Sequence, residues 1–245
     1  MPPRLFTDAP LSAGAQLDLP PTASRHVQVL RLQPGDPVLL FNGAGGQWQA
    51  EVTDMGRKSV AVRVTAHDNH ECELATPVTL ALGMPANERM DTLVEKATEL
   101  GVHRIVPLVC ERSVLRVAGD RAERKAAHWQ AIAVAACEQC GRNRVPEVAQ
   151  PLSLREWLAR PADLPARRWM LSLADGTQPL LRAARLQAQA PTVVLSGPEG
   201  GLSPTEMVAA TAQGFAPITL GPRVLRADTA PLAVLACLAA LEDPA

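Results

Sequence analysis

The residues with the clearest chemical meaning in this sequence are the glycines of a loop near its carboxyl end. The apolar run Thr192–Leu195 leads into Ser196-Gly197-Pro198-Glu199-Gly200-Gly201. Three glycines within five residues, beside a proline without a backbone N–H, let the chain turn sharply and expose bare backbone to a ligand. Because the apolar run predicts a buried strand, the loop predicts a binding site at the end of that strand.

A second loop of the same kind follows another short apolar run. Pro217–Leu220 predicts a strand, Gly221-Pro222-Arg223-Val224-Leu225-Arg226 forms the loop, and an apolar helix is expected from Thr229 to Leu241. Two transitions of one type predict that both loops lie at one edge of a parallel sheet. Ligands bind at that edge in open α/β folds.

The loops favour an adenosyl ligand that carries no phosphate. The first loop lacks the G-x-G-x-x-G dinucleotide fingerprint, and no Walker A lysine follows it. The carboxylate of Glu199 would repel phosphate and favour a cationic ligand, and S-adenosylmethionine is a nucleoside with a sulfonium. An ordinary tight turn explains either loop alone, but it explains the pair poorly.

Composition indicates a folded chain without a global basic field. Of 245 residues, 16 are Gly and 22 are Pro, a share below the roughly 25–30% typical of disordered chains. The net charge of -1 means that any RNA partner must be met by a local patch. An odd count of five cysteines, no signal-peptide pattern after Met1 and no apolar run of ~20 residues predict a cytoplasmic protein without a membrane span.

The first part of the chain, from Arg4 to about Asn69, predicts a small β domain. Strands are expected over Pro37–Phe41, Gly46–Thr53 and Lys58–Thr65. Val60, Val62 and Val64 alternate with less apolar residues, so their strand should have one buried face and one solvated face. A small barrel or curled sheet is the expected result.

A short helix and a polar stretch complete this part of the chain. Ser24 is expected to cap a helix over Arg25–Leu32. The stretch His67–Thr76 is polar and has no periodicity. We therefore expect the domains to comprise residues 1–70 and 75–245.

The second domain alternates strand and helix, which predicts an α/β fold with a largely parallel sheet. Strands are expected over Val78–Leu82, Ile105–Val109, Trp169–Leu173, Thr192–Leu195 and Pro217–Leu220, and helices over Asn87–Leu100, Asp120–Cys140 and Pro179–Gln187. Asn87 should cap its helix. Ser203, Pro204 and Glu206 predict a further helix that begins with a capping box and a proline at its first position.

Three motifs together resemble one known enzyme family. They are Gly197-Pro198-Glu199-Gly200-Gly201-Leu202-Ser203, Leu220-Gly221-Pro222-Arg223-Val224-Leu225-Arg226 and Glu138-Gln139-Cys140-Gly141-Arg142. In these motifs, and over nearly its whole length, the chain resembles the bacterial 16S ribosomal RNA uridine-N3 methyltransferases of the SPOUT superfamily. The segment Arg25–Gly35 looks like the N-terminal RNA-binding region of that family.

The resemblance implies an N-terminal PUA-like β-barrel followed by a SPOUT α/β methyltransferase domain with a C-terminal trefoil knot, in a homodimer. It implies S-adenosylmethionine as cofactor and 16S ribosomal RNA within the assembled 30S subunit as substrate. Carried over residue by residue, it assigns the adenosyl group to Leu195, Gly197, Gly200, Gly201, Leu220, Gly221 and Leu225, with Leu173 closing the pocket. Glu199 joins this set because of its charge.

The chain departs from the family pattern at two places. The family usually has Arg-Thr-Glu-Thr-Ala where this chain has Arg226-Ala227-Asp228-Thr229-Ala230, and it usually has Ser at the position of Cys140. Aspartate keeps the charge of glutamate but has a shorter reach. The role of Asp228 therefore stays open.

Cys137 and Cys140 are spaced as in redox motifs and as in half of a zinc site. They stand at the end of an Ala-rich helix, and no second Cys pair or suitable His spacing completes a site. We therefore interpret them as small helix residues and expect no metal.

RNA contact is expected from cations in three stretches of the chain. The expected residues are Arg25, His26, Arg31, Arg142, Arg144 and Arg223. Two of these stretches also have a structural explanation. His26 could belong to a solvated helix face, and Arg142 and Arg144 follow a helix C-terminus, where cations complement the dipole.

Methylation of uridine at N3 requires loss of a weakly acidic imide proton, so the site needs a base or a fixed cation that stabilises the anionic ring. Arg226 follows the ligand loop and is the expected cation, with Arg223 or an arginine of a second subunit as the alternative. The target must be unpaired or extruded, because N3 is occupied in a paired helix. Two other functions stay open: a noncatalytic RNA-binding ribosome-assembly factor, and methylation of another RNA position or of transfer RNA.

Overall fold

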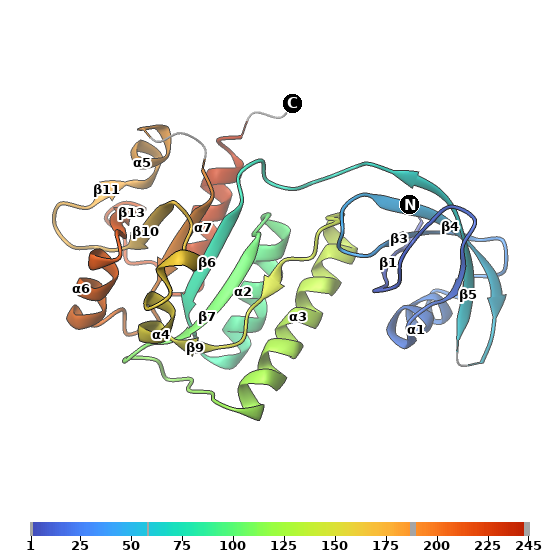
Figure 1. Ribbon diagram of the computed structural model, residues 1–245, viewed down its shortest axis with the longest axis horizontal. Coiled ribbons are helices and arrows are strands. Elements are labelled where there is room, and N and C mark those ends of the chain that lie inside the picture. Colours follow the sequence, from blue (N-terminus) through green and yellow to red (C-terminus); the bar gives the residue numbers. More distant parts are fainter. Residues whose placement is uncertain (1, 58, 187–189, 243–245) are drawn as a thin grey trace. The chain divides into compact units, whose positions relative to one another are not determined.

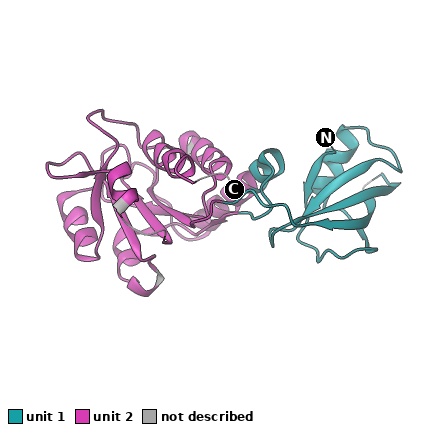
Figure 2. Ribbon diagram, turned by 90° about the horizontal axis from the view of Figure 1, so that it is seen from above, with its two compact units in different colours: residues 1–73, 134–145 teal, residues 74–133, 146–245 magenta. Residues whose placement is uncertain are grey.

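The computed structural model describes residues 2–57, 59–186 and 190–242. The chain forms two compact units, coloured separately in Figure 2: residues 1–73 with 134–145 make unit 1, and residues 74–133 with 146–245 make unit 2. Unit 1 thus takes in residues 134–145, which the sequence pattern assigned to the second domain. No helix within the described ranges has both the length and the apolar character needed to cross a membrane.

Unit 1 is built on a five-stranded sheet with the order β1-β3-β4-β5-β2 (Figure 1). Its strands are β1 (Arg4–Phe6), β2 (Gln16–Asp18), β3 (Pro37–Phe41), β4 (Gln47–Met55) and β5 (Val60–Asp68). β1 pairs with β3 in parallel, and the other described pairs are antiparallel. β4 and β5 extend past the expected ends Thr53 and Thr65, and Lys58, the expected start of the latter strand, lies outside the described residues.

One face of this sheet forms the core of unit 1. Val60, Val62 and Val64 of β5 are at most 1% exposed, which confirms the alternation expected from the sequence. Helix α1 (Pro21–Val29) contributes Ala23 and Val27 to the same core. The helix therefore covers the apolar face of the sheet.

The helix α1 begins earlier than expected, and Ser24 does not cap it. The N-cap residue is Pro20, and Ser24 lies buried inside the helix. The Ser24 hydroxyl donates to the carbonyl of Leu19 (2.9 Å) and accepts from the N–H of Val60 (3.2 Å). The serine that the sequence indicated as a cap instead joins the helix to β5.

Unit 2 is built on a parallel sheet with the order β11-β13-β10-β12-β6-β7-β8, in which β9 also pairs with β7 (Figure 1). Its strands are β6 (Val78–Gly83), β7 (Arg104–Val109), β8 (Glu147–Val148), β9 (Leu152–Ser153), β10 (Arg167–Leu171), β11 (Gln178–Pro179), β12 (Thr192–Ser196) and β13 (Ala216–Thr219). All described pairs are parallel, as the alternation of strand and helix predicts. Every residue of β6 and β12 is buried, because helices cover both faces of these strands.

The helices of unit 2 shield the sheet on both faces (Figure 1). They are α2 (Asn87–Glu99), α3 (Asp120–Cys140), which belongs to unit 2 up to residue 133 and to unit 1 beyond it, α4 (Leu154–Leu158), the 3-10 turn η1 (Pro161–Asp163), α5 (Leu180–Leu186), α6 (Pro204–Ala212) and α7 (Thr229–Ala239). α7 packs against α2, α5 and β12, whereas α4 packs against α6. With both faces covered, the carboxyl ends of the strands are the edge left for a ligand.

Several element ends in unit 2 differ from the expected ones. α2 has Ala86 as its N-cap without a side-chain cap, so Asn87 is its first helical residue and not its cap. β10 ends at Leu171, which places Leu173 in the loop after the strand. Gln187, the expected end of α5, lies outside the described residues.

The start of α6 matches the sequence prediction. Pro204 is the first helical residue, and the N–H of Glu206 donates to Ser203 Oγ (3.2 Å) while the N–H of Ser203 donates to Glu206 Oε2 (2.8 Å). The second oxygen, Glu206 Oε1, accepts from the N–H of Glu111 in the loop after β7 (2.8 Å). A buried carboxylate therefore joins α6 to that loop.

The substitution Glu206→Gln should lower the free energy of unfolding by about 2–3 kcal/mol, because the amide loses one charge-assisted bond to a buried N–H. Urea denaturation followed by circular dichroism measures this change. Glu156→Gln is the matched control, since Glu156 forms the same capping box with Ser153 but is exposed, and its loss should be much smaller. Equal losses in the two variants would show that the bond to Glu111 contributes nothing.

Candidate functional site

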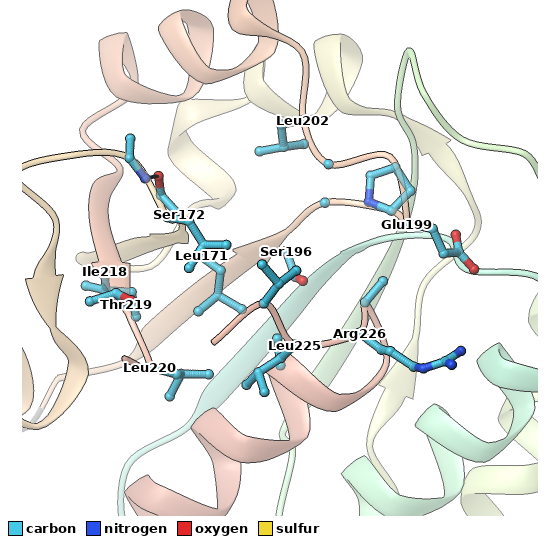
Figure 3. Close-up of a pocket in the computed structure, with 18 of the residues that line it drawn as sticks. Leu171, Ser172, Ser196, Glu199, Leu202, Ile218, Thr219, Leu220, Leu225 and Arg226 are labelled. Carbon is cyan, nitrogen blue, oxygen red and sulfur yellow. Dashed lines mark hydrogen bonds between the residues drawn. The ribbon is translucent and has the colours of Figure 1, made fainter. Parts of the chain in front are cut away.

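A cavity of about 600 Å³ lies at the carboxyl ends of β10, β12 and β13 (Figure 3). Its lining comes from residues 171–174, 196–199, 201–202, 218–220 and 223–227, together with Arg89, Met207 and Ala230. The two glycine loops therefore meet at one edge of the parallel sheet, as their positions after apolar strands predicted.

The loop after β12 is closed by contact between its own backbone segments. A Cβ at Gly197 would lie 2.8 Å from the nitrogen of Leu202, so only glycine fits there. The N–H of Gly201 donates to the carbonyl of Pro198 (2.8 Å) and completes the turn. Because Gly197 and Gly201 both line the cavity, a ligand meets main chain at this wall.

Leucine side chains form the apolar part of the wall. Leu171 ends β10, Leu202 ends the glycine loop, and Leu220 and Leu225 come from the loop after β13. Figure 3 shows these side chains around one cavity. Leu173 also lines it and is 57% exposed, which places it at the rim. An apolar wall beside bare backbone suits the flat face and the polar edge of a nucleobase.

The carboxylate of Glu199 is engaged with the start of α2. Its Oε1 accepts from the N–H of Ala86 (3.1 Å) and lies 3.4 Å from Nη1 of Arg89. A carboxylate at a helix N-terminus is favoured by the helix dipole. Glu199 does line the cavity, but these contacts give its carboxylate a role other than the contact with a cationic ligand that the sequence suggested.

Arginines from two elements line the same cavity: Arg89 of α2, and Arg223 and Arg226 of the loop after β13. Arg223 and Arg226 are exposed, and neither has an ion-pair partner in the described part of the chain. The Arg226 carbonyl accepts from the N–H groups of Thr229 and Ala230 (3.0 Å each), which anchors its backbone. Figure 3 shows the Arg226 side chain extending away from the leucines, on the side where Glu199 lies. An unpaired guanidinium on a fixed backbone can stabilise negative charge that develops beside it.

Asp228, whose role the sequence left open, caps α7. Its Oδ1 accepts from the N–H of Thr229 (3.0 Å). This bond to the next residue suits the short reach of aspartate.

Three of the expected cofactor residues lie outside the cavity lining. Leu195 is fully buried in the core that the sheet shares with α4 and α6. Gly200 lies against Arg112. Gly221 has a φ of 107°, and its N–H donates to Thr219 Oγ1 (3.2 Å). Gly200 and Gly221 belong to the loops and Leu195 to β12, and none of the three lines the cavity.

The sequence did not indicate Arg89, Leu171, Ser172 or Ser196, which also line the cavity. For Leu171 and Ser172 a signal was available, because they stand where a third parallel strand ends beside the two loops. No sequence signal indicated Arg89, because its helix lies beside the loop that follows β12 only in the folded chain.

In unit 1 the cations expected to contact RNA differ in their exposure. Arg25 and His26 are exposed on α1, and Arg31 follows the helix, exposed, with a φ of 57°. Arg142 is only 2% exposed, and its Nε donates to both carboxylate oxygens of Glu73 (3.1 Å each). These contacts favour the structural explanation of Arg142 over RNA contact, because its guanidinium is enclosed and paired with Glu73.

Of the two residues that follow Arg142, one is buried and the other is exposed. Asn143 is fully buried, donates from Nδ2 to the carbonyl of His70 (2.6 Å) and accepts at Oδ1 from Arg4 (2.8 Å). Arg144 is exposed and lies 3.3 Å from Glu71. This stretch therefore links segments of unit 1 that are distant in sequence, and it leaves one cation, Arg144, at the surface.

Cys137 is unsuited to metal or redox chemistry. It is fully buried, and burial raises the pKa of its thiol to about 12, so the thiol stays protonated at neutral pH. Within the described ranges, no group of three or more His, Cys, Asp or Glu side chains is arranged to hold a metal ion. Cys137 and Cys140 are residues of α3.

Comparisons with known proteins agree over both units. The RNA methyltransferase domain family matches residues 72–239, and the RNA methyltransferase PUA domain family matches residues 19–65. Ribosomal RNA small subunit methyltransferase E of Synechocystis is 36% identical over 224 residues, which cover 90% of this chain and 72% of that protein.

Two solved structures align with 98% of this chain and 98% of their own. One is ribosomal RNA small subunit methyltransferase E of Neisseria gonorrhoeae bound to S-adenosyl methionine, with 34% identity and a TM-score of 0.89. The other is a protein of Legionella pneumophila in complex with the bound cofactor SAM, with 33% identity and a TM-score of 0.91.

The substitution Arg142→Ala should lower the melting temperature of unit 1 by about 10 °C, because it leaves the Glu73 carboxylate without its buried partner. Differential scanning calorimetry measures this shift. Arg144→Ala, which removes an exposed cation two positions later, should change the melting temperature little. An unchanged melting temperature in Arg142→Ala, together with weaker RNA binding, would return Arg142 to the RNA-contact set.

Proposed function

Because the chain belongs to the RNA methyltransferase family and carries the PUA domain of such enzymes, we propose that it transfers a methyl group from S-adenosylmethionine to N3 of a uridine in 16S ribosomal RNA. The observation that carries this proposal is the cavity where two glycine loops and the end of β10 meet beside a leucine wall. Bare backbone and apolar side chains suit an adenosyl group, and the arginines suit a nucleotide substrate.

The proposed cofactor contacts divide by chemistry. Gly197 and Gly201 would offer backbone groups, while Leu220 and Leu225 would contact the adenine face and Leu173 would cover it at the rim. The remaining expected residues would act indirectly: Leu195 through the packing of β12, Gly200 and Gly221 through the shape of their loops, and Glu199 through its bond to the start of α2. When bound, S-adenosylmethionine supplies an electrophilic methyl group on a sulfonium.

On the substrate side, the proposed reaction needs a uridine that has lost its N3 proton to solvent. N3 then forms a bond to the methyl carbon, and the carbon–sulfur bond breaks with its electron pair left on sulfur. Arg226 would stabilise the negative charge on the uracil ring, since its guanidinium lines the cavity and has no ion-pair partner among the described residues. The target base must be unpaired or extruded to reach this position.

We also infer the trefoil knot that the family resemblance implies. β13 lies beyond β10 in the sheet, whereas α7, which follows it, packs against β12 and α2. The segment between them, residues 220–228, must therefore cross the carboxyl ends of other strands, beside the loop 196–202. Such a crossing supports a threaded C-terminal segment.

The remaining parts of the proposal concern RNA and assembly. Unit 1 would act as a PUA-like β-barrel, and the exposed Arg25, His26, Arg31 and Arg144, with Arg223 at the cavity, would contact RNA. The substrate would be 16S ribosomal RNA within the assembled 30S subunit. The enzyme would act in the cytoplasm as a homodimer, with α7 contributing to the interface.

The substitution Arg226→Ala should lower the single-turnover rate of methyl transfer by roughly 10²–10³-fold, because it removes a preorganised cation that acts on charge developing in the reaction. Cofactor affinity should change little, since the cofactor is held mainly by backbone and leucines. Rapid-quench assays with tritiated S-adenosylmethionine and 30S subunits give the rate, and calorimetry gives the affinity.

Glu199→Gln provides the contrast for this experiment. It weakens the tie between the glycine loop and α2, so it should reduce cofactor affinity more than the rate at saturating cofactor. A normal single-turnover rate in Arg226→Ala would make that residue structural and would turn attention to Arg223 or to an arginine of a second subunit.

A further inference from the structure

The turn after β7 contacts the glycine loop that follows β12, but the turn itself does not line the cavity. Residues 110–113 form this turn, in which the N–H of Ser113 donates to the carbonyl of Cys110 (3.1 Å) and the N–H of Cys110 donates to Ser113 Oγ (3.0 Å). Cys110 and Ser113 are both buried, so the turn is fixed to the core. Arg112 stands inside it.

The guanidinium of Arg112 bonds to main-chain carbonyls of the glycine loop. Its Nη1 donates to the carbonyl of Gly200 (3.0 Å) and to the carbonyl of Leu202 (3.4 Å). No carboxylate pairs with Arg112 in the described part of the chain. These carbonyls are therefore the partners that orient this side chain.

Each carbonyl that Arg112 holds belongs to a peptide group whose N–H is also fixed. The N–H of Gly201 donates to the carbonyl of Pro198 (2.8 Å), and the N–H of Ser203 donates to Glu206 Oε2 (2.8 Å). Since a peptide group is planar, fixing both of its ends sets its orientation. The 200–201 and 202–203 peptides are thus held on both sides.

The peptide between them, which joins Gly201 to Leu202, is left for a ligand. Among the described residues, neither its carbonyl nor its N–H has a hydrogen-bond partner within the protein. Gly201 and Leu202 both line the cavity. Two fixed peptides therefore flank one that can bond to an adenosyl group.

The packing of Arg112 on the loop is close as well as polar. A Cβ at Gly200 would lie 3.0 Å from the Cβ of Arg112, so the aliphatic part of the arginine rests directly on the glycine. This contact accounts for a glycine that lies outside the cavity lining. Glu199 bonds the same loop to the start of α2. The loop is therefore held by the connection after β6 and by the connection after β7.

We propose that Arg112 is a positioning residue for cofactor binding: by holding the carbonyls of Gly200 and Leu202, it presents the Gly201–Leu202 peptide to the adenosyl group. This inference rests on the proposed function of the cavity. Arg112 does not line the cavity, so its loss should affect cofactor affinity and not the chemical step.

The test compares the full-length protein with Arg112→Ala and Arg112→Lys. Calorimetric titration with S-adenosylhomocysteine should show about 5- to 20-fold weaker binding in Arg112→Ala, as expected for the loss of charge-assisted bonds. Arg112→Lys, which keeps a donor at this place, should recover part of the affinity. The KM for S-adenosylmethionine should rise by a similar factor, while kcat at saturating cofactor stays within about 3-fold.

Arg116→Ala is the matched control. Arg116 lies on the same connection and donates from Nη2 to a main-chain carbonyl, that of Glu111 (3.1 Å), but it does not reach the glycine loop. It should keep the parent's cofactor affinity. Equal affinity in Arg112→Ala and the parent, or a fall in kcat without a change in affinity, would overturn the inference.

Hydrogen exchange separates this inference from the proposed function. In cofactor-free Arg112→Ala, amides of residues 199–203 should exchange faster than in the parent, with the rest of unit 2 unchanged. If the parent bound no S-adenosylmethionine, the proposed function would fail, and the exchange result alone would decide whether Arg112 holds the loop. Unchanged exchange would reject that role.

Discussion

The contact on which the rest of unit 2 depends is the packing of Gly197 against the Gly201–Leu202 peptide, main chain on main chain. It closes the loop after β12 and brings it against the ends of the neighbouring strands. There Gly83 of β6 faces Pro198, and Arg112 after β7 covers Gly200. Because neighbouring elements already hold this backbone, its shape does not have to be formed by a ligand, and binding costs less conformational entropy.

The loop after β13 carries the other half of the site and separates two kinds of chemistry. Leu220 and Leu225 supply apolar wall, whereas Arg223 and Arg226 supply charge. The cap from Asp228 and the bonds to the carbonyl of Arg226 fix the end of this loop to α7. One short segment can therefore supply both the apolar wall for a cofactor and the cations for a substrate. The orientation of both sets of side chains depends on where α7 begins.

Local patterns in the sequence predicted the elements well, and long-range contacts account for most of the errors. The strands of unit 2, the capping box at Ser203 and the meeting of the two loops follow from apolar runs, turn residues and the direction of parallel strands. The roles of Ser24 and Arg142 do not, because each is decided by a partner distant in sequence or by burial that no local pattern reports. Arg112 escaped notice for the same reason: its partners lie on a loop that only the fold brings to it.

The measurement that tests the central claim most directly is a map of modified nucleotides in 16S ribosomal RNA from cells with and without this gene. Mass spectrometry of nuclease digests identifies the base, and primer extension locates it, because a methyl group at N3 blocks Watson–Crick pairing. The account predicts one N3-methyluridine that is present in the parent strain, absent after deletion and restored by the intact gene. An unchanged N3-methyluridine content after deletion, or the loss of a different modification, would contradict it.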